Sequence, residues 1–112
     1  MGHSYGGILV SHVLKHWKAT TPIEVHIVAS PLLGTSMLKN ICGYEPIEKI
    51  TNNTVLFEWR TQHQLDSIYK NLSEDPQQIN IQGSHVTILP DTYKGNRLGH
   101  NWSISWVADE AF

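Results

Sequence analysis

A glycine-flanked serine stands near the start of the chain, in the run Gly2-His3-Ser4-Tyr5-Gly6-Gly7. In a Gly-x-Ser-x-Gly pattern that opens an apolar helix, the serine can occupy a strained strand-to-helix turn, where the flanking glycines avoid steric collisions. Such a turn directs the hydroxyl toward a substrate, so that it can act as a nucleophile. The alternative interpretation is a glycine-rich helix start without chemistry.

A serine hydroxyl needs two partners to attack at neutral pH. A histidine takes the hydroxyl proton and returns it to the leaving group, while a carboxylate holds the imidazole in the correct tautomer. Among the seven histidines, His100 is the preferred base, because Gly99 leaves room for a tight loop and the pair follows the last predicted strand. A surface-loop histidine without a catalytic role is the alternative interpretation of His100.

Composition argues against several other functions. The chain has 112 residues, a net charge of −2 and no cluster of Lys or Arg, so it lacks the basic footprint of a protein that binds nucleic acid or an anionic membrane. The single cysteine, Cys42, cannot form an internal disulfide, and no signal peptide or membrane span is recognisable, so we expect a cytoplasmic protein by default. His12 and His16 share a helix face, but no carboxylate or cysteine accompanies them in sequence. We therefore predict neither a metal site nor a cofactor.

The spacing of apolar residues predicts alternating helices and strands. Helices are expected over Ile8 to Trp17, Ser36 to Cys42, Thr61 to Leu72 and Trp102 to Ala108. Strands are expected over Ile23 to Ala29 and Thr54 to Arg60, and two β segments, Ile79 to Ile81 and His85 to Leu89, form either one bulged strand or a small hairpin. Asp91 to Leu98 is expected to be a loop.

This order of elements, with its two ends, resembles the second half of the α/β-hydrolase fold. The Gly2 to Gly7 run looks like the nucleophile elbow of esterases and lipases, Ala29 to Gly34 resembles the loop after the next strand in lipase-like members, and Gly99-His100-Asn101 is similar to the late catalytic histidine. The resemblance implies an α/β fold with a small, mostly parallel sheet and flanking helices. It also implies that residues 1–112 form a single partial domain that lacks the first half of the fold.

The family order of serine, acid and histidine guides the choice of the acid. The resemblance places the carboxylate in the loop after Thr54 to Arg60, which points to Asp66, although an aspartate there can equally be a helix N-cap. A rival alignment puts Val86 where the carboxylate would fall and makes Asp91 the nearest substitute. The resemblance further implies that the backbone N–H of Tyr5 contributes to an oxyanion hole.

We therefore expect the C-terminal part of a serine hydrolase that cleaves small-molecule or lipid esters through Ser4, Asp66 and His100. Because parallel strands are normally flanked by neighbours, the absence of the first-half strands predicts that the isolated chain is oligomeric or only marginally folded. Whether the isolated chain is active is left open. The alternative is a non-catalytic half-fold that dimerises or docks on a partner that supplies those strands. Trp102 and Trp106 can join such an interface, although packing in the core is the commoner fate of these side chains.

Overall fold

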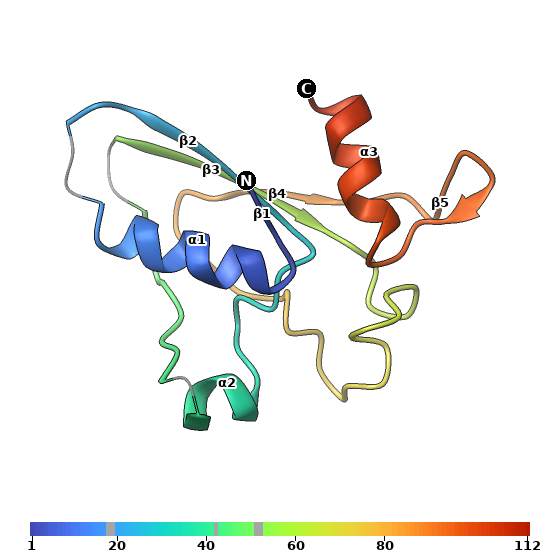
Figure 1. Cartoon of the computed structure of the whole chain (residues 1–112), viewed down its shortest axis with the longest axis horizontal. Coiled ribbons are helices and arrows are strands. Elements are labelled where there is room, and N and C mark those ends of the chain that lie inside the picture. The colour runs from blue at the N-terminus through green and yellow to red at the C-terminus, as the bar shows by residue number, and fades with distance from the viewer. Residues whose placement is uncertain (18–19, 42, 51–52) are drawn as a thin grey trace.

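Four parallel strands form the central sheet of the computed structural model, which describes residues 1–17, 20–41, 43–50 and 53–112 (Figure 1). The strands are β1 (Gly2–His3), β2 (Ile23–Val28), β3 (Thr54–Arg60) and β4 (His85–Ile88), and they lie side by side in chain order. Each neighbouring pair is parallel. The predicted α/β class, with a small parallel sheet and flanking helices, is confirmed.

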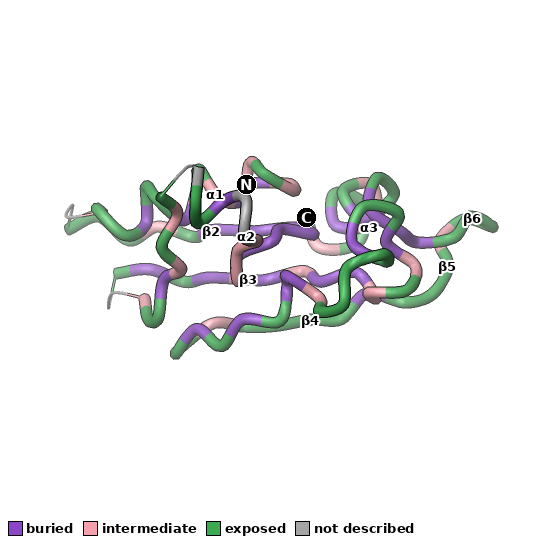
Figure 2. Tube along the Cα trace, turned by 90° about the horizontal axis from the view of Figure 1, so that it is seen from below, coloured by how far each residue is buried: buried purple, intermediate pink, exposed green. Residues whose placement is uncertain are grey.

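The two inner strands carry most of the pairing and most of the burial. Six residue pairs join β2 to β3, from Ile23 opposite Thr54 to Val28 opposite Trp59. Along β3 the burial alternates, with Leu56 and Glu58 buried and Val55 exposed, because successive side chains point to opposite faces of a strand. Figure 2 shows the buried residues concentrated along β2 and β3, whereas β4 at the edge is exposed throughout.

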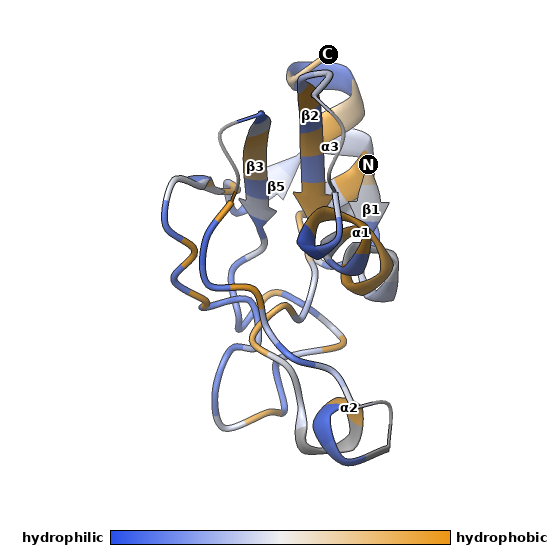
Figure 3. Ribbon diagram, turned by 90° about the vertical axis from the view of Figure 1, so that its left-hand side faces the viewer, coloured by the Kyte–Doolittle hydropathy of each residue, from blue (hydrophilic) through white to orange (hydrophobic). Residues whose placement is uncertain are grey.

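Helices cover both faces of the sheet. Helix α1 (Tyr5–Lys15) packs Leu14 into a core with Val25 and Leu56, while helix α3 (Trp102–Glu110) packs Val107 against Val28 on the opposite face (Figure 1). The short helix α2 (Ser36–Ile41) stands away from the sheet (Figure 3). Cys42, expected at the end of this helix, lies outside the described residues. None of the helices in the described ranges is long and apolar enough to cross a membrane.

The helix predicted over Thr61 to Leu72 is wrong, because this segment consists of turns. Backbone bonds from Asp66 N–H to Gln62 O and from Lys70 N–H to Asp66 O close single turns at 3.1 Å and 2.9 Å. The Asp66 carboxylate binds the N–H groups of Ile68 and Tyr69, and such side-chain bonds compete with helix propagation. The apolar residues of this segment do not mark a helix face. Tyr69, for example, is buried in the interior with only 2 % of its surface exposed.

The predictions for the second half of the β region also need correction. Only His85–Ile88 forms a strand, so neither a bulged strand nor a hairpin joins it to Ile79 and Ile81. Those two isoleucines are buried in the core beside α1, and the next residue, Gln82, makes an isolated parallel bridge with Lys49. Their β-type pattern reflects burial without sheet pairing.

The loop predicted over Asp91 to Leu98 contains a small antiparallel hairpin. Its strands are β5 (Thr92–Tyr93) and β6 (Asn96–Arg97). Lys94 and Gly95 link them with φ values of 51° and 76°. Two successive residues with positive φ are the requirement of a two-residue hairpin turn whose twist matches that of the strands.

Two glycines allow α1 to lie close to its neighbours. A Cβ on Gly2 would lie 2.7 Å from the carbonyl oxygen of Gly6, and a Cβ on Gly7 would lie 2.3 Å from Ser30 Oγ. A Cβ on Gly6 would meet nothing within 4 Å. The steric role expected of the glycines on both sides of Ser4 therefore holds for Gly2 but not for Gly6, and Gly7 takes that role on the helix side.

Gly7→Ala is expected to destabilise the fold by about 1–3 kcal/mol, because the added methyl group forces α1 away from β2 and the following loop. Gly6→Ala is the matched control in the same helix, and it should stabilise by about 0.5–1 kcal/mol through its helix propensity. Urea unfolding measures both effects. Equal stability of the two variants would contradict the close contact between Gly7 and Ser30.

Candidate active site

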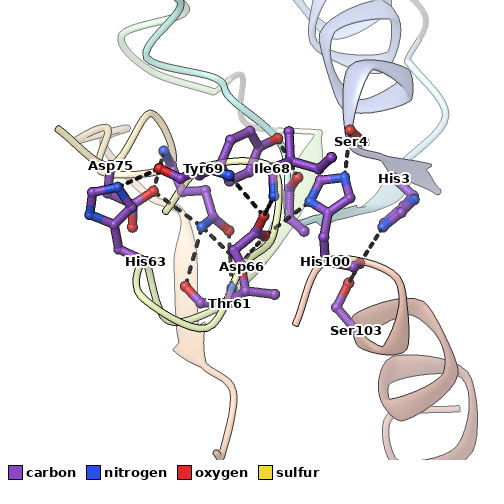
Figure 4. A network of polar contacts seen from close by, with 12 residues as sticks. His3, Ser4, Thr61, His63, Asp66, Ile68, Tyr69, Asp75, His100 and Ser103 are labelled. Carbon is purple, nitrogen blue, oxygen red and sulfur yellow. Dashed lines mark hydrogen bonds and ion pairs between the residues drawn. The ribbon is translucent and has the colours of Figure 1, made fainter. Parts of the chain in front are cut away.

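The structure brings Ser4, Asp66 and His100 together from three separate loops at the carboxyl-terminal edge of the sheet (Figure 4). Ser4 follows β1 directly, Asp66 lies in the segment after β3, and His100 precedes α3. Since the four strands of the central sheet are parallel, the loops that follow them converge on this one edge, where open α/β sheets usually bind ligands.

Ser4 occupies a strained backbone position between β1 and α1. Its φ of 55° and ψ of −126° are sparsely populated for a residue with a side chain, at a cost on the order of 1–3 kcal/mol. The position is held because its N–H donates to Val28 O at 2.9 Å and its carbonyl accepts from Gly7 N–H at 3.0 Å. Although serine is a favoured helix N-cap, the Ser4 side chain makes no capping bond. Its hydroxyl is thus directed away from the helix and toward His100.

The His100 imidazole bridges the other two side chains. Its Nε2 lies 2.8 Å from Ser4 Oγ and its Nδ1 lies 2.9 Å from Asp66 Oδ2. The His100 carbonyl accepts hydrogen bonds from His3 Nε2–H at 2.9 Å and from Ser103 Oγ–H at 2.6 Å. These bonds hold the main chain of His100, and the ring is buried with only 5 % of the residue exposed.

Gly99 allows the His100 loop to approach the Asp66 loop. A Cβ at position 99 would lie 2.5 Å from the carbonyl oxygen of Leu65, the residue before Asp66. Gly99 N–H also donates to Arg97 O at 3.0 Å and its carbonyl accepts from Ser103 N–H at 3.1 Å. The space that a glycine leaves at this point is therefore used for the contact between the two loops.

The Asp66 carboxylate is fully buried and accepts four hydrogen bonds. Oδ2 accepts from His100 and, at 2.6 Å, from Thr61 Oγ1–H. Oδ1 accepts from the N–H groups of Ile68 and Tyr69 at 2.9 Å and 3.1 Å. Within the described residues, Asp66 is followed by turns and not by a helix, so the helix N-cap weighed for it is wrong; Oδ1 instead closes a local turn, while Oδ2 binds His100.

These contacts determine the ionisation of Asp66 and the tautomer of His100. Burial alone raises the pKa of the Asp66 carboxyl, but hydrogen bonds from His100 and Thr61 and the attraction to His100 outweigh it and hold this pKa below its ordinary value of 3.8. Asp66 is therefore ionised at neutral pH and accepts the Nδ1 proton of His100. With the proton on Nδ1, Nε2 is the acceptor of the hydrogen bond from Ser4 Oγ–H.

The rival acid lies elsewhere. Asp91 is exposed, and its side chain accepts a hydrogen bond from Gln62 Nε2.

Tyr5 is the first residue of α1, so its backbone N–H belongs to the helix turn whose donors have no intrahelical partner. In the part of the chain that the structure describes, no group of three or more His, Cys, Asp or Glu side chains is arranged to hold a metal ion.

Several residues that support the site have no recognisable sequence signal. Thr61 donates to Asp66 and accepts from Gln77 Nε2 at 2.9 Å, while the Gln77 side-chain oxygen accepts from Thr61 N–H at 3.0 Å. Tyr69 and His3 both place their rings against the His100 ring, with centroids 5.1 Å and 4.9 Å away. These contacts join residues distant in the sequence, so apolar periodicity does not reveal them.

Comparison with protein-family models, curated proteins and solved structures found no match for this chain.

Replacing Asp66 with Asn is expected to remove stability in a pH-dependent way. Because folding lowers the pKa of Asp66 below 3.8, its stabilising contribution is complete above about pH 5 and is lost as the pH falls through 3.8 toward the folded-state pKa. The gap in unfolding free energy between wild type and Asp66→Asn should therefore narrow below about pH 4.

Denaturant unfolding at several pH values between about 5 and 2 measures this gap. Glu74→Gln, at an exposed carboxylate, is the control and should change the unfolding free energy by less than about 0.5 kcal/mol. A gap between wild type and Asp66→Asn that widens steadily on acidification below pH 4 would show that the sign of the Asp66 shift is wrong.

Proposed function

We propose that this chain acts as a serine hydrolase of the α/β-hydrolase class and cleaves small-molecule or lipid esters. The observation that carries the proposal is the hydrogen-bonded series from Ser4 Oγ to His100 Nε2 at 2.8 Å and from His100 Nδ1 to Asp66 Oδ2 at 2.9 Å. A nucleophile, a base and an orienting carboxylate in this geometry are what acyl transfer through serine requires.

The arrangement of the strands supports the same class. The serine follows β1, the carboxylate follows β3 and the histidine follows β4, in a sheet whose strands are parallel and lie in chain order. This gives the chain order Ser4, Asp66, His100, which is the order of the α/β-hydrolase triad. A serine at the strained turn argues against the relatives that use an aspartate nucleophile.

In the proposed reaction, Ser4 Oγ attacks the acyl carbon of the ester while its proton passes to His100 Nε2. Asp66 stabilises the resulting imidazolium, and the backbone N–H of Tyr5 donates to the oxyanion of the tetrahedral intermediate. The carbon–oxygen bond to the alcohol then breaks, and His100 gives its proton to the departing oxygen. Water, deprotonated by His100, attacks the acyl-serine, and collapse of this second intermediate returns the proton to Ser4 and releases the acid.

Ser4→Ala should reduce hydrolysis of a short-chain p-nitrophenyl ester to background, a loss on the order of 10⁴-fold or more, and should abolish labelling by a fluorophosphonate probe. Ser73→Ala, at an exposed serine in a turn, is the matched control and should leave both unchanged. Wild-type protein that melts cooperatively yet neither hydrolyses the ester nor reacts with the probe would overturn the proposed activity.

Asp66→Asn should lower kcat by roughly 10⁴-fold, because a neutral amide favours the wrong tautomer of His100 and leaves its imidazolium without a counter-charge. Asp91→Asn tests the rival acid and should retain wild-type kcat, since Asp91 is exposed and bonded to Gln62. The assignment of the acid fails if Asp91→Asn loses activity while Asp66→Asn keeps it.

Exposed apolar side chains favour a second candidate function, that of an interaction or oligomerisation protein. Leu9 and Val13 on α1 are 71 % and 52 % exposed, and Val86 and Ile88 on β4 are 45 % and 53 % exposed. Of the two tryptophans weighed for an interface, Trp102 is 41 % exposed, but Trp106 packs beside the core. A folded chain that associates in solution but fails to react with the probe would favour this second function.

A further inference from the structure

Tyr69 contacts the proposed catalytic series through its backbone N–H and its ring, and its hydroxyl binds the backbone nearby (Figure 4). Its backbone N–H donates to Asp66 Oδ1 at 3.1 Å. Its ring meets the His100 imidazole at a centroid distance of 5.1 Å and an angle of 87°. Its hydroxyl donates to the carbonyl of Ala29 at 2.8 Å. Tyr69 is 2 % exposed, so this side chain belongs to the interior beneath the site.

The carbonyl that anchors the hydroxyl lies next to the backbone that holds Ser4. Ala29 follows Val28, whose own carbonyl accepts the Ser4 N–H at 2.9 Å. Ala29 is buried and has a φ of 47°, a left-handed conformation that is uncommon for a residue with a side chain. Its N–H donates to Trp59 O at 2.9 Å, which ties this turn to β3. The backbone at Val28 and Ala29, which accepts the Tyr69 hydroxyl, is thus bonded to Ser4 on one side and to Trp59 of β3 on the other.

The Tyr69 hydroxyl remains a hydrogen-bond donor at neutral pH. Burial raises the pKa of this hydroxyl well above its ordinary value of 10.0. The phenol therefore stays protonated and keeps its hydrogen bond to Ala29 O.

We propose that Tyr69 is a positioning residue for Ser4 and His100, with its hydroxyl anchored on Ala29 beside Ser4 and its ring restraining the imidazole. The inference rests on the proposed hydrolase function. His3 and Ser103 bind the His100 carbonyl and so hold its main chain, whereas the Tyr69 ring packs on the imidazole itself. The ring limits rotation of His100 away from Ser4 Oγ, and the bond from the hydroxyl to Ala29 O ties the ring to the backbone segment that also holds Ser4.

Two variants separate the roles of the hydroxyl and the ring. Tyr69→Phe removes the bond to Ala29 and keeps the ring and the N–H bond to Asp66, so kcat should fall about tenfold with KM unchanged. Tyr69→Leu also removes the aromatic ring, so kcat should fall about 100-fold, the scale expected when a catalytic group is displaced by about 1 Å.

Tyr44→Phe is the matched control, because the Tyr44 hydroxyl also donates to a backbone carbonyl, that of Leu32, and makes no contact with the series. It should lower the melting temperature about as much as Tyr69→Phe does and leave kcat unchanged. The rate of fluorophosphonate labelling should follow kcat in all three variants, because it reports the nucleophilicity of Ser4 directly. Wild-type rates in both Tyr69 variants would overturn the inference while leaving the hydrolase function intact.

A second measurement is independent of turnover. The downfield proton resonance of the His100–Asp66 hydrogen bond should be present in wild type and in Tyr44→Phe, and should be lost or shifted in Tyr69→Leu. If wild type shows no hydrolysis or labelling but Tyr69→Leu alone loses this resonance, the proposed function fails and the positioning role stands. If Tyr69→Leu keeps the wild-type resonance, the ring does not position His100.

Discussion

The buried hydrogen bond between the Asp66 carboxylate and the His100 imidazole is the interaction on which the site depends. A carboxylate without exposure to water would be neutral unless donors replaced its hydration. Here Thr61 and two backbone N–H groups join His100 as donors, so the charge is retained. That charge sets the proton on Nδ1, and the proton on Nδ1 leaves Nε2 as an acceptor for Ser4.

The site includes two residues with unfavourable backbone conformations, which neighbouring strands hold in place. The Ser4 backbone is strained at φ 55°, and Ala29 opposite it is left-handed at φ 47°. Both residues are tied to the inner strands, Ser4 through Val28 O and Ala29 through Trp59 O. The rigid pairing of β2 with β3 therefore holds the unfavourable conformations that direct the serine hydroxyl.

A parallel sheet also explains why distant loops meet here. Ser4 and His100 are separated by 96 positions, and Asp66 and His100 by 34, yet each side chain leaves the same edge of the sheet. Close approach at this edge requires the absence of a side chain at Gly2 next to α1 and at Gly99 next to Leu65. Gly2 is therefore required by the contact between β1 and α1, and Gly99 by the contact between the His100 and Asp66 loops.

Local pattern was sufficient for the parts of this protein that depend on near neighbours. Alternation over Thr54 to Arg60 predicted β3 and its faces, apolar spacing predicted α1 and α3, and the glycine-flanked run singled out Ser4. The same patterns failed over Thr61 to Leu72, where a side-chain carboxylate binds the N–H groups that a helix would use. The bounds of β4 were not predicted, because they depend on its pairing with β3. That pairing joins residues 28 positions apart, such as Phe57 and His85.

Only the tertiary structure decided the surroundings of the three side chains. Thr61, Tyr69 and Gln77 lie in an irregular segment and are defined by bonds to residues up to 40 positions away, such as the bond from the Tyr69 hydroxyl to Ala29. The sequence by itself determined which residue types were present and which short segments would form strands or helices, because those depend on local periodicity. Which carboxylate faces His100, and what holds the imidazole in place, follow from the packing of loops across the edge of the sheet.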